Sequence, residues 1–209
     1  MPKSGRLHLL PKHAIMKFLL STTVALLLAV TATAQNEPKG LMTGQEAPNF
    51  YGKDQYGKKT ELRTALKKGP VVVLFYRGQW CPYCNKQLGQ LEDSLGQITA
   101  RGAMVVAITP EKPESINETI KKTKASFPIV WDEGLKIMKA YDVAYAVNDT
   151  MVSKLKKYGI DLQQLNGKNG TNLPVPAVYI IGQDGKITYR YFDADYTHRA
   201  SVREILEHL

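Results

Sequence analysis

The sequence predicts an α/β domain in which a mixed central β-sheet is flanked by helices. Residues 71–76, "VVVLFY", and 103–109, "AMVVAIT", are continuous apolar runs rich in β-branched side chains, which is typical of strands buried on both faces. Between them a helical pattern begins at Pro82 and ends before Gly102, which predicts a parallel strand pair with a right-handed crossover. Residues 177–192 contain two further strand runs around an Asp-Gly turn, which predicts an antiparallel hairpin in the same sheet.

The first 34 of the 209 residues have the pattern of an export signal. Lys17 precedes an apolar run over 18–30, and the small residues Ala32 and Ala34 follow it. The run is shorter than the ~20 residues that a membrane-spanning helix requires. We therefore expect a signal peptide over 1–34, a periplasmic location and no stable membrane span once the signal is removed. An uncleaved anchor is the alternative interpretation, and Met16 is an alternative start of the chain.

The remaining elements can be assigned in order. Residues 35–43 are expected to form a flexible lead to a domain that spans 44–209. Two short strand-like runs around "YGKK" predict an N-terminal β-hairpin. After the second buried strand the pattern gives, in order, a helix over 114–125, a strand over 127–131, a helix over 134–141, a helical and then Gly/Asn-rich insertion over 148–172, the late hairpin and a final amphipathic helix over 197–209.

The chain is basic, with a formal net charge of +9 and a pI near 9.4. Its Lys and Arg residues are scattered or follow helix faces and are not interleaved with aromatic residues, so we expect a solvated basic surface and no nucleic-acid partner. Zinc requires four ligands, and the chain offers two cysteines and, beyond the signal, only His198 and His208. We therefore expect no metal and no other cofactor.

The two cysteines, Cys81 and Cys84, lie where the strand over 71–76 passes into the next helix. Cys81 would take the N-cap and Cys84 the first turn, where unpaired N–H groups and the helix dipole stabilise a thiolate. A bridge across so short a loop removes little unfolded-state entropy and would be a weak staple. We therefore predict a redox-active pair that closes a Cys81–Cys84 disulfide, with a structural bridge and an inert buried pair as alternatives.

"LFYRGQWCPYC", with its flanking strand and helix, resembles the thioredoxin-fold superfamily and, more narrowly, its peroxiredoxin-like (AhpC/TSA, redoxin) branch. "GQEAPNF" is similar to the N-terminal G-x-x-A-P-x-F motif of that branch, and "ITPEKPESI" to its strand–loop–helix after the second strand. "LPVPAVYIIGQDGKITY" resembles the strand hairpin shared with thioredoxins. The resemblance covers residues 44–209, and it implies a thioredoxin-like fold with thiol chemistry directed at peroxides or disulfides.

The resemblance also assigns roles to single residues. Peroxiredoxins carry F-Y-P-x-x-x-T-x-x-C, in which Cys84 matches the cysteine that attacks peroxide, Cys81 replaces the threonine and Arg77 the proline. The second arginine of the family falls near Pro176 and is missing, and Arg77 is the candidate to supply its charge, because peroxide cleavage needs donors aimed at the oxygens. Thioredoxin-like enzymes differ, because their first cysteine attacks and a cis-proline, here Pro176, lies opposite the pair.

The leading hypothesis is a thiol-dependent peroxidase that reduces hydrogen peroxide or organic hydroperoxides. Cys84 would attack and become a sulfenic acid, Cys81 would close the disulfide, and an external thioredoxin-like dithiol protein would reduce it. The alternatives are an exported thiol–disulfide oxidoreductase, in which Cys81 attacks a protein disulfide, and a non-catalytic redox sensor. Trp80 is expected to shield the pair or to pack in the core. Residues 195–199 could approach the pair, but capping of the last helix by Thr197 is the preferred interpretation.

Overall fold

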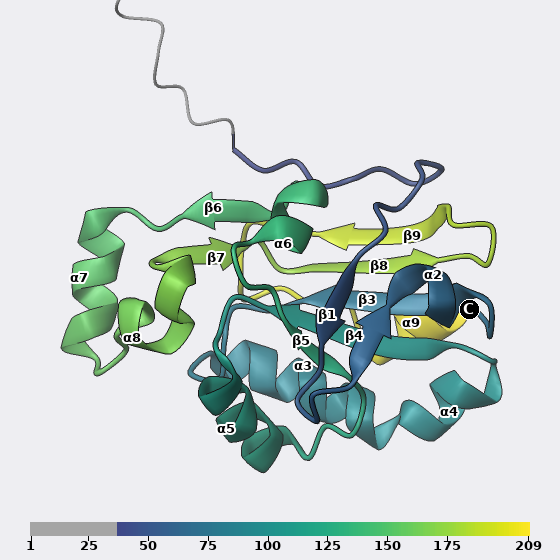
Figure 1. Ribbon diagram of the computed structural model, residues 1–209, viewed down its shortest axis with the longest axis horizontal. Helices are drawn as coiled ribbons and strands as arrows, with labels where there is room; N and C mark the ends of the chain where they lie inside the picture. Colours follow the sequence, from purple (N-terminus) through teal and green to yellow (C-terminus); the bar gives the residue numbers. More distant parts are fainter. Residues whose placement is uncertain (1–36) are drawn as a thin grey trace, which may run out of the picture. The chain divides into compact units, whose positions relative to one another are not determined.

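A five-stranded mixed sheet, ordered β5-β4-β3-β8-β9, forms the centre of the fold (Figure 1). The computed structural model describes residues 37–209, and the signal peptide predicted over 1–34 lies outside them. β3 pairs in parallel with β4 and antiparallel with β8, so the predicted mixed α/β architecture is confirmed. The strands of the sheet are β3 (Val71–Phe75), β4 (Met104–Thr109), β5 (Ile129–Trp131), β8 (Ala177–Ile181) and β9 (Ile187–Phe192).

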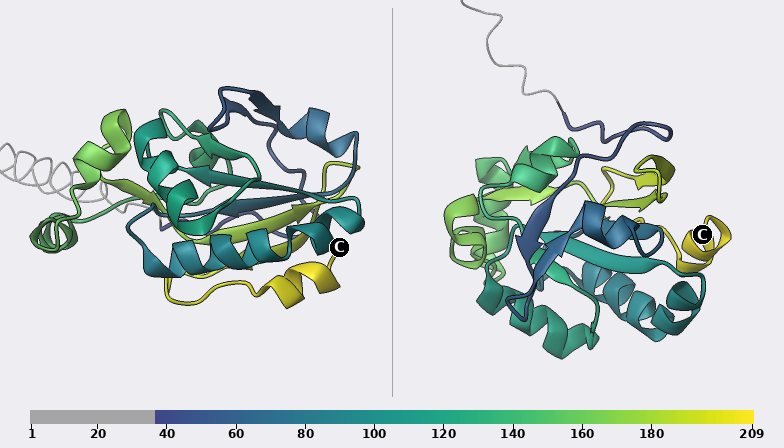
Figure 2. Two further views of the ribbon diagram at one scale, coloured as in Figure 1. Left: turned by 90° about the horizontal axis from the view of Figure 1, so that it is seen from below. Right: turned by 45° about the vertical axis from the view of Figure 1, so that its right-hand side comes forward.

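Each face of the sheet is covered by its own layer, as Figure 2 shows. The α3 and α4 helices (Pro82–Asp93 and Leu95–Ala100), together with α5 (Pro113–Thr123) and α9 (Val202–Glu207), pack on one face. The hairpin and the helices α2 (Leu62–Leu66) and α6 (Lys136–Ala140) pack on the other. Every residue of β3 is buried, because its alternate side chains enter the two opposite cores. Each fully buried aliphatic side chain stabilises the folded state by about 1.5–3 kcal/mol, so β3 holds the start of the loop that follows it in a fixed position.

The N-terminal hairpin is confirmed and consists of β1 (Tyr51–Lys53) and β2 (Lys59–Glu61). It lies close against the edge strand β5, since a Cβ at Gly52 would come within 2.3 Å of Val130 Cγ1. Gln55, at the hairpin turn, donates to the carbonyl of Phe127 at 3.0 Å and accepts from the N–H of Ile129 at 2.7 Å. The side chain of Gln55 therefore satisfies edge groups that another strand would otherwise pair with.

The described part of the lead predicted to be flexible is bonded to the domain. The N–H of Gly40 donates to the carbonyl of Asp142 at 2.9 Å, and the N–H of Leu41 donates to the Tyr179 hydroxyl at 3.1 Å. Arg190 also donates to the carbonyl of Lys39 at 2.6 Å. The compact unit begins at Pro38 and includes these residues.

The insertion differs from the prediction in one respect. It contains the expected helices, α7 (Asp149–Lys157) and α8 (Leu162–Asn166), followed by a short 3-10 turn, η1 (Gly167–Asn169). These helices are enclosed by an antiparallel ribbon of β6 (Ala144–Ala146) and β7 (Asn172–Pro174), which the sequence pattern did not indicate. Each ribbon strand has three residues, too few for a period-2 pattern to be recognised.

The last helix begins later than predicted. α9 starts after Ser201, whose hydroxyl accepts from the N–H of Glu204 while the Glu204 carboxylate accepts from the N–H of Ser201. This capping box satisfies two N-terminal donors, so the expectation that Thr197 caps the helix is wrong. The Thr197 hydroxyl instead donates to Asp195 at 2.7 Å. Residues 193–200 are thereby left as a loop.

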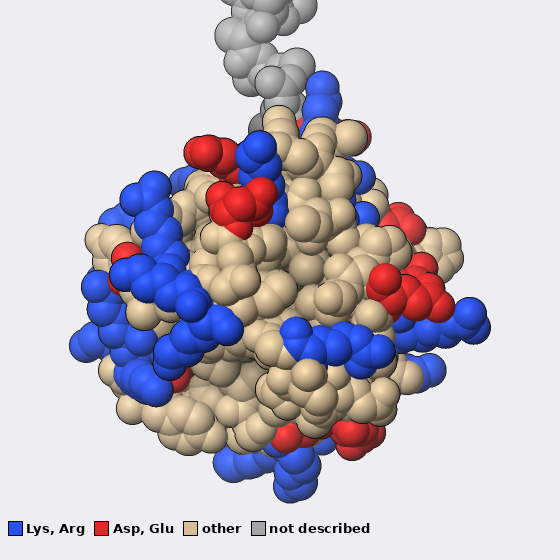
Figure 3. Space-filling model, turned by 90° about the vertical axis from the view of Figure 1, so that its right-hand side faces the viewer, with Lys and Arg blue, Asp and Glu red and all other residues tan. Residues whose placement is uncertain are grey.

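Basic and acidic side chains are both distributed over the face that Figure 3 shows, with acidic groups between the basic ones. Within residues 37–209, none of the helices has the length and apolar character needed to cross a bilayer. The absence of a nucleic-acid partner stays a prediction.

Candidate redox site

The two cysteines lie at the carboxyl end of β3, where the chain turns into α3. Cys81 is the N-cap residue, Pro82 occupies the first helical position, and Cys84 lies in the first turn. Both are free thiols, and both are buried, with relative exposures of 1% for Cys81 and 0% for Cys84. The structure therefore holds the reduced pair, and the Cys81–Cys84 disulfide stays a prediction for the oxidised state.

A glycine shapes the loop that presents the cysteines. Gly78 has φ +153°, and a Cβ there would lie 2.6 Å from both Glu111 Oε1 and Trp80 Nε1. No other residue fits without displacing these groups. The carbonyl of Gly78 accepts from the N–H of Cys81 at 3.1 Å, so the position of the first cysteine depends on this tight turn.

Arg199 places its guanidinium on the two sulfurs. Its Nη2 lies 3.5 Å from Cys84 Sγ and 3.9 Å from Cys81 Sγ. Sequence reasoning had assigned the segment 195–199 to helix capping, and its other interpretation, approach to the site, is the one the structure bears out for Arg199. The sequence contained little indication of this contact, because the loop between β9 and α9 is far from the cysteines along the chain and approaches them only once β3 and β9 have joined the same sheet.

The loop that carries Arg199 is held by its own polar groups. Arg199 Nη1 donates to the carbonyl oxygens of Tyr196 and His198. Asp195 accepts from the N–H of Thr197 at 2.9 Å, and Asp193 lies 3.0 Å from His198 Nδ1. These contacts order the guanidinium before any substrate arrives, which reduces the reorganisation that a reaction requires.

Arg77, predicted to supply positive charge, is directed at aromatic rings. Its guanidinium lies 4.1 Å from the ring centroid of Tyr196 and 4.8 Å from that of Trp80. Tyr196 also packs edge-to-face on Tyr83, with ring centroids 6.1 Å apart. Arg77 therefore connects the Arg199 loop to the cysteine loop through cation–π contacts, and its role as a charge donor stays a prediction.

The pKa values of the two cysteines are shifted in opposite directions. Burial alone would raise the pKa of Cys84, but the hydrogen bond from the Cys81 thiol and the charge of Arg199 outweigh it and lower the pKa of Cys84 to about 6. The hydrogen bond to Cys84, together with burial, raises the pKa of Cys81. Near neutral pH the site therefore holds a Cys84 thiolate and a Cys81 thiol, and the nucleophilic form belongs to Cys84.

The other predicted site residues are more peripheral. Trp80 is half-buried and packs against both the core of the α3 face and the small core of the insertion. Pro176 precedes β8, and its carbonyl accepts from the N–H of Asp193 at 3.4 Å. Its peptide bond is trans, as are all others in residues 37–209, so the cis conformation considered for Pro176 is wrong.

Sequence reasoning did not select Glu111, which lies in the loop after β4. It is fully buried beside the cysteine loop, and its Oε2 accepts from the N–H of Gln79 at 2.7 Å. The motif "ITPEKPESI" contained this residue, but a charged residue before a helix is usually exposed, so the pattern carried no signal of burial.

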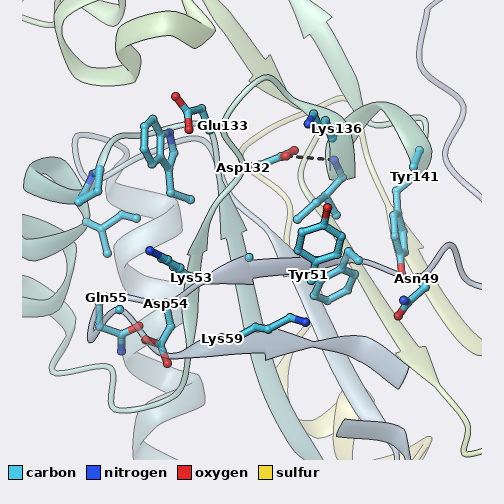
Figure 4. A pocket seen from close by; sticks show the side chains of 18 residues that line it. Asn49, Tyr51, Lys53, Asp54, Gln55, Lys59, Asp132, Glu133, Lys136 and Tyr141 are labelled. Carbon is cyan, nitrogen blue, oxygen red and sulfur yellow. Dashed lines mark hydrogen bonds between the residues drawn. The ribbon is translucent and has the colours of Figure 1, made fainter. Parts of the chain in front are cut away.

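A separate hollow lies beside the edge strand β5, lined by the hairpin β1–β2, the first turn of α5 and α6 (Figure 4). Its volume is about 890 Å³, and neither cysteine lines it. Asp132 points toward the start of α6 and accepts from the N–H groups of Ile137 at 3.0 Å and Met138 at 2.8 Å. Its carboxylate is thus occupied in capping a helix, and the cysteine site is the better candidate for chemistry.

Comparison with known proteins identifies the family. The AhpC/TSA family model matches residues 43–190, which is most of the chain. The chain belongs to the AhpC/TSA family. The peroxiredoxin-like resemblance is therefore confirmed, and the buried cysteine pair and this AhpC/TSA membership agree on thiol-based redox chemistry.

Curated relatives of this AhpC/TSA protein fall into two groups. It is 40% identical over 100 residues to the chloroplastic peroxiredoxin Q of Populus jackii, covering 48% of this chain and 46% of that one. It is 30% identical over 115 residues to the thiol-disulfide oxidoreductase ResA of Bacillus cereus, covering 54% and 65%. The matches thus span about half to two thirds of the length of these relatives.

A solved structure supports the fold. The peroxidoxin BcpB of Mycobacterium tuberculosis superimposes with a TM-score of 0.62 at 19% identity, covering 80% of this chain and 96% of that one. At such identity the likeness concerns the fold alone. It confirms the predicted thioredoxin-like fold.

Proposed function

We propose that this protein is a thiol-dependent peroxidase in which Cys84 attacks a hydroperoxide. The observation that carries the proposal is the 3.5 Å contact between Arg199 Nη2 and Cys84 Sγ. A guanidinium there stabilises the thiolate before the reaction and is placed to bind the peroxide oxygens as negative charge develops on them. Arg199 thereby supplies the charge that the missing arginine near Pro176 would have supplied.

In the first step, the Cys84 thiolate attacks the outer oxygen of the hydroperoxide. The S–O bond forms as the O–O bond breaks, Cys84 becomes a sulfenic acid, and the departing alkoxide takes a proton to leave as an alcohol, or as water when the substrate is hydrogen peroxide. In the second step the sulfur of Cys81 attacks the sulfur of Cys84. The S–S bond forms, the S–O bond breaks, and the hydroxide leaves as water with the proton of the Cys81 thiol.

The burial of the sulfurs favours a small substrate. Cys84 has no exposed surface, and Cys81 has 1%. A hydroperoxide needs only a limited displacement of the side chains above the pair, whereas a folded protein that carries a disulfide has to contact the attacking sulfur directly. An external thioredoxin-like dithiol protein is proposed as the reductant. It acts once the disulfide has formed, when no thiolate remains to attract Arg199.

The test compares wild type, Cys81→Ser and Cys84→Ser in two assays: consumption of hydrogen peroxide and reduction of a protein disulfide. We expect Cys81→Ser to form a sulfenic acid that a dimedone probe traps, and Cys84→Ser to form none. Trapping in Cys84→Ser but not in Cys81→Ser would reverse the assigned roles.

A thiol–disulfide oxidoreductase is the second candidate function. The similarity to ResA, a thiol-disulfide oxidoreductase, favours it, as does the Cys-x-x-Cys spacing. Cys81 would then attack a protein disulfide and Cys84 would resolve the mixed disulfide. Rapid disulfide reduction without peroxide turnover would support this function, and inactivity in both assays would support a redox sensor. Export to the periplasm is proposed from the pattern of residues 1–34 alone, outside the described residues.

A further inference from the structure

Glu111 is a buried carboxyl group beside the cysteine loop that the proposed reaction does not use. Its relative exposure is 0%. Oε2 accepts one hydrogen bond, from the N–H of Gln79, and Oε1 has no hydrogen-bond partner among the described residues. Gly78 closes the space next to Oε1, since a Cβ there would lie 2.6 Å away. A carboxylate buried with a single donor is poorly stabilised, so a second negative charge close to it shifts the group toward the neutral acid.

The charged and titratable groups that face Glu111 do not compensate its charge. Lys122, on α5, binds the side-chain and main-chain oxygens of Gln79 instead. Tyr76, at the end of β3, donates its hydroxyl to Thr119 at 3.3 Å. Cys84, on α3, adds a negative charge that opposes ionisation. Burial first, and the Cys84 charge after it, raise the pKa of Glu111 to about 8, while the Gln79 N–H and the Lys122 charge lower it less.

We propose that Glu111 takes up a proton when the Cys81–Cys84 disulfide is reduced and releases it when the disulfide forms. This proposal rests on the redox pair proposed above, and it holds whether the oxidant is a peroxide or a disulfide. A buried thiolate and a buried carboxylate repel one another, so the site favours one negative charge over two. The charge lies on Cys84 in the reduced state and on Glu111 in the oxidised state.

The balance of the reduction is complete. The disulfide, the Glu111 carboxylate, two electrons and two protons give the Cys81 thiol, the Cys84 thiolate and the Glu111 carboxylic acid. The S–S bond breaks, one proton binds Cys81 and the other binds Glu111, and the electrons come from the external dithiol. Because the buried site carries one negative charge before and after, Cys84 remains a thiolate without a second charge to repel it. Glu111 therefore acts on the reaction through Cys84, by keeping the buried site at a single negative charge.

The experiment counts the protons bound when the disulfide is reduced. Full-length protein is oxidised, then reduced with a phosphine near pH 7 in weak buffer, and proton uptake is corrected for the reagent. The variants are Glu111→Gln and Glu114→Gln, the latter being an exposed glutamate three positions along the chain. We expect wild type and Glu114→Gln to bind more than one proton per disulfide, and Glu111→Gln to bind one. Equal uptake in wild type and Glu111→Gln would overturn the proposal.

A second measurement uses only the wild type, so the proposal can be tested even if Glu111→Gln does not fold. The reduced-minus-oxidised infrared difference spectrum should contain the carbonyl stretch of a protonated carboxylic acid. Its absence from folded wild type would contradict the proposal. Both experiments need only the disulfide, formed with diamide, so they can succeed where peroxide turnover is absent. Failure of diamide to link Cys81 and Cys84 would instead refute the redox pair and the proposed function.

Discussion

At the residue scale, the site depends on which groups stabilise charge on Cys84. Arg199 attracts negative charge to the sulfur at 3.5 Å, and Glu111 opposes a second negative charge from within the protein. The order of the two cysteines in the chain does not decide which one attacks. The surroundings of each sulfur decide which cysteine attacks, because Cys84 accepts hydrogen bonds while Cys81 donates one.

Arg199→Gln is expected to raise the pKa of Cys84 from about 6 toward the ordinary thiol value, since the variant removes a positive charge near the sulfur. Loss of one preorganised donor typically slows a reaction by about 10²–10³-fold, so peroxide reduction should slow by at least ~10-fold. The pKa is measured from the ultraviolet absorbance of the thiolate, and the rate by stopped flow. Arg203→Gln is the control, because Arg203 is exposed and pairs with Glu207 at 2.8 Å. An unchanged pKa in Arg199→Gln would contradict the assigned role.

Glu111→Gln is expected to stabilise the reduced protein increasingly as the pH rises. The pKa of Glu111 is raised to about 8, so the stability linked to its protonation is complete below the ordinary value of 4.5 and is lost as the pH rises toward 8. Each pH unit in that window lowers the free energy of unfolding of the wild type by at most about 1.4 kcal/mol through this group. The glutamine variant has no such loss, because glutamine does not titrate. Urea unfolding near pH 5 and near pH 8 measures the difference. A variant-minus-wild-type difference that does not grow with pH would contradict the buried charge assigned to Glu111.

At the element scale, local sequence patterns predicted most of the domain. The buried strands, the helix that Pro82 begins and the Asp-Gly hairpin all have patterns that neighbouring residues create. The ribbon β6–β7 was missed because its pairing joins segments on either side of the insertion. The approach of Arg199 to the cysteines was only the second interpretation of its segment for the same reason, since a loop residue near the end of the chain meets the cysteines only in the folded protein. Residues whose role depends on long-range contact leave no periodic signal.

Ser201→Ala should destabilise the domain by about 0.5–2 kcal/mol, because it removes the N-cap of α9. Thr197→Ala, at the position where the cap was predicted, should have a smaller effect, since its hydroxyl donates an exposed hydrogen bond to Asp195 and not to a backbone group of α9. Denaturant unfolding of the two variants gives the comparison. A larger loss in Thr197→Ala would restore the original capping assignment.

At the scale of the whole molecule, the site joins parts of the chain that the sheet brings together. The cysteines come from the β3–α3 junction, Glu111 from the loop after β4, and Arg199 from the loop after β9. Both β3 and β4 run in the same direction, so their following loops lie at one edge of the sheet. The mixed topology therefore places a thiolate, a carboxyl group and a guanidinium at that edge, although each belongs to a different element.

Oxidation is expected to loosen the loop over 193–200. In the reduced state Arg199 is attracted by the Cys84 thiolate and fixed by the carbonyls of Tyr196 and His198, whereas a disulfide carries no charge to attract it. Amide hydrogen exchange in this loop should therefore be faster in the oxidised than in the reduced protein, and reduced Cys84→Ser should resemble the oxidised protein. The hairpin β1–β2, on the other face of the sheet, serves as the internal control and should exchange equally in all three samples. Equal exchange of the loop in the two redox states would mean that its carbonyl contacts hold Arg199 without the thiolate, and that access to the disulfide must come from another movement.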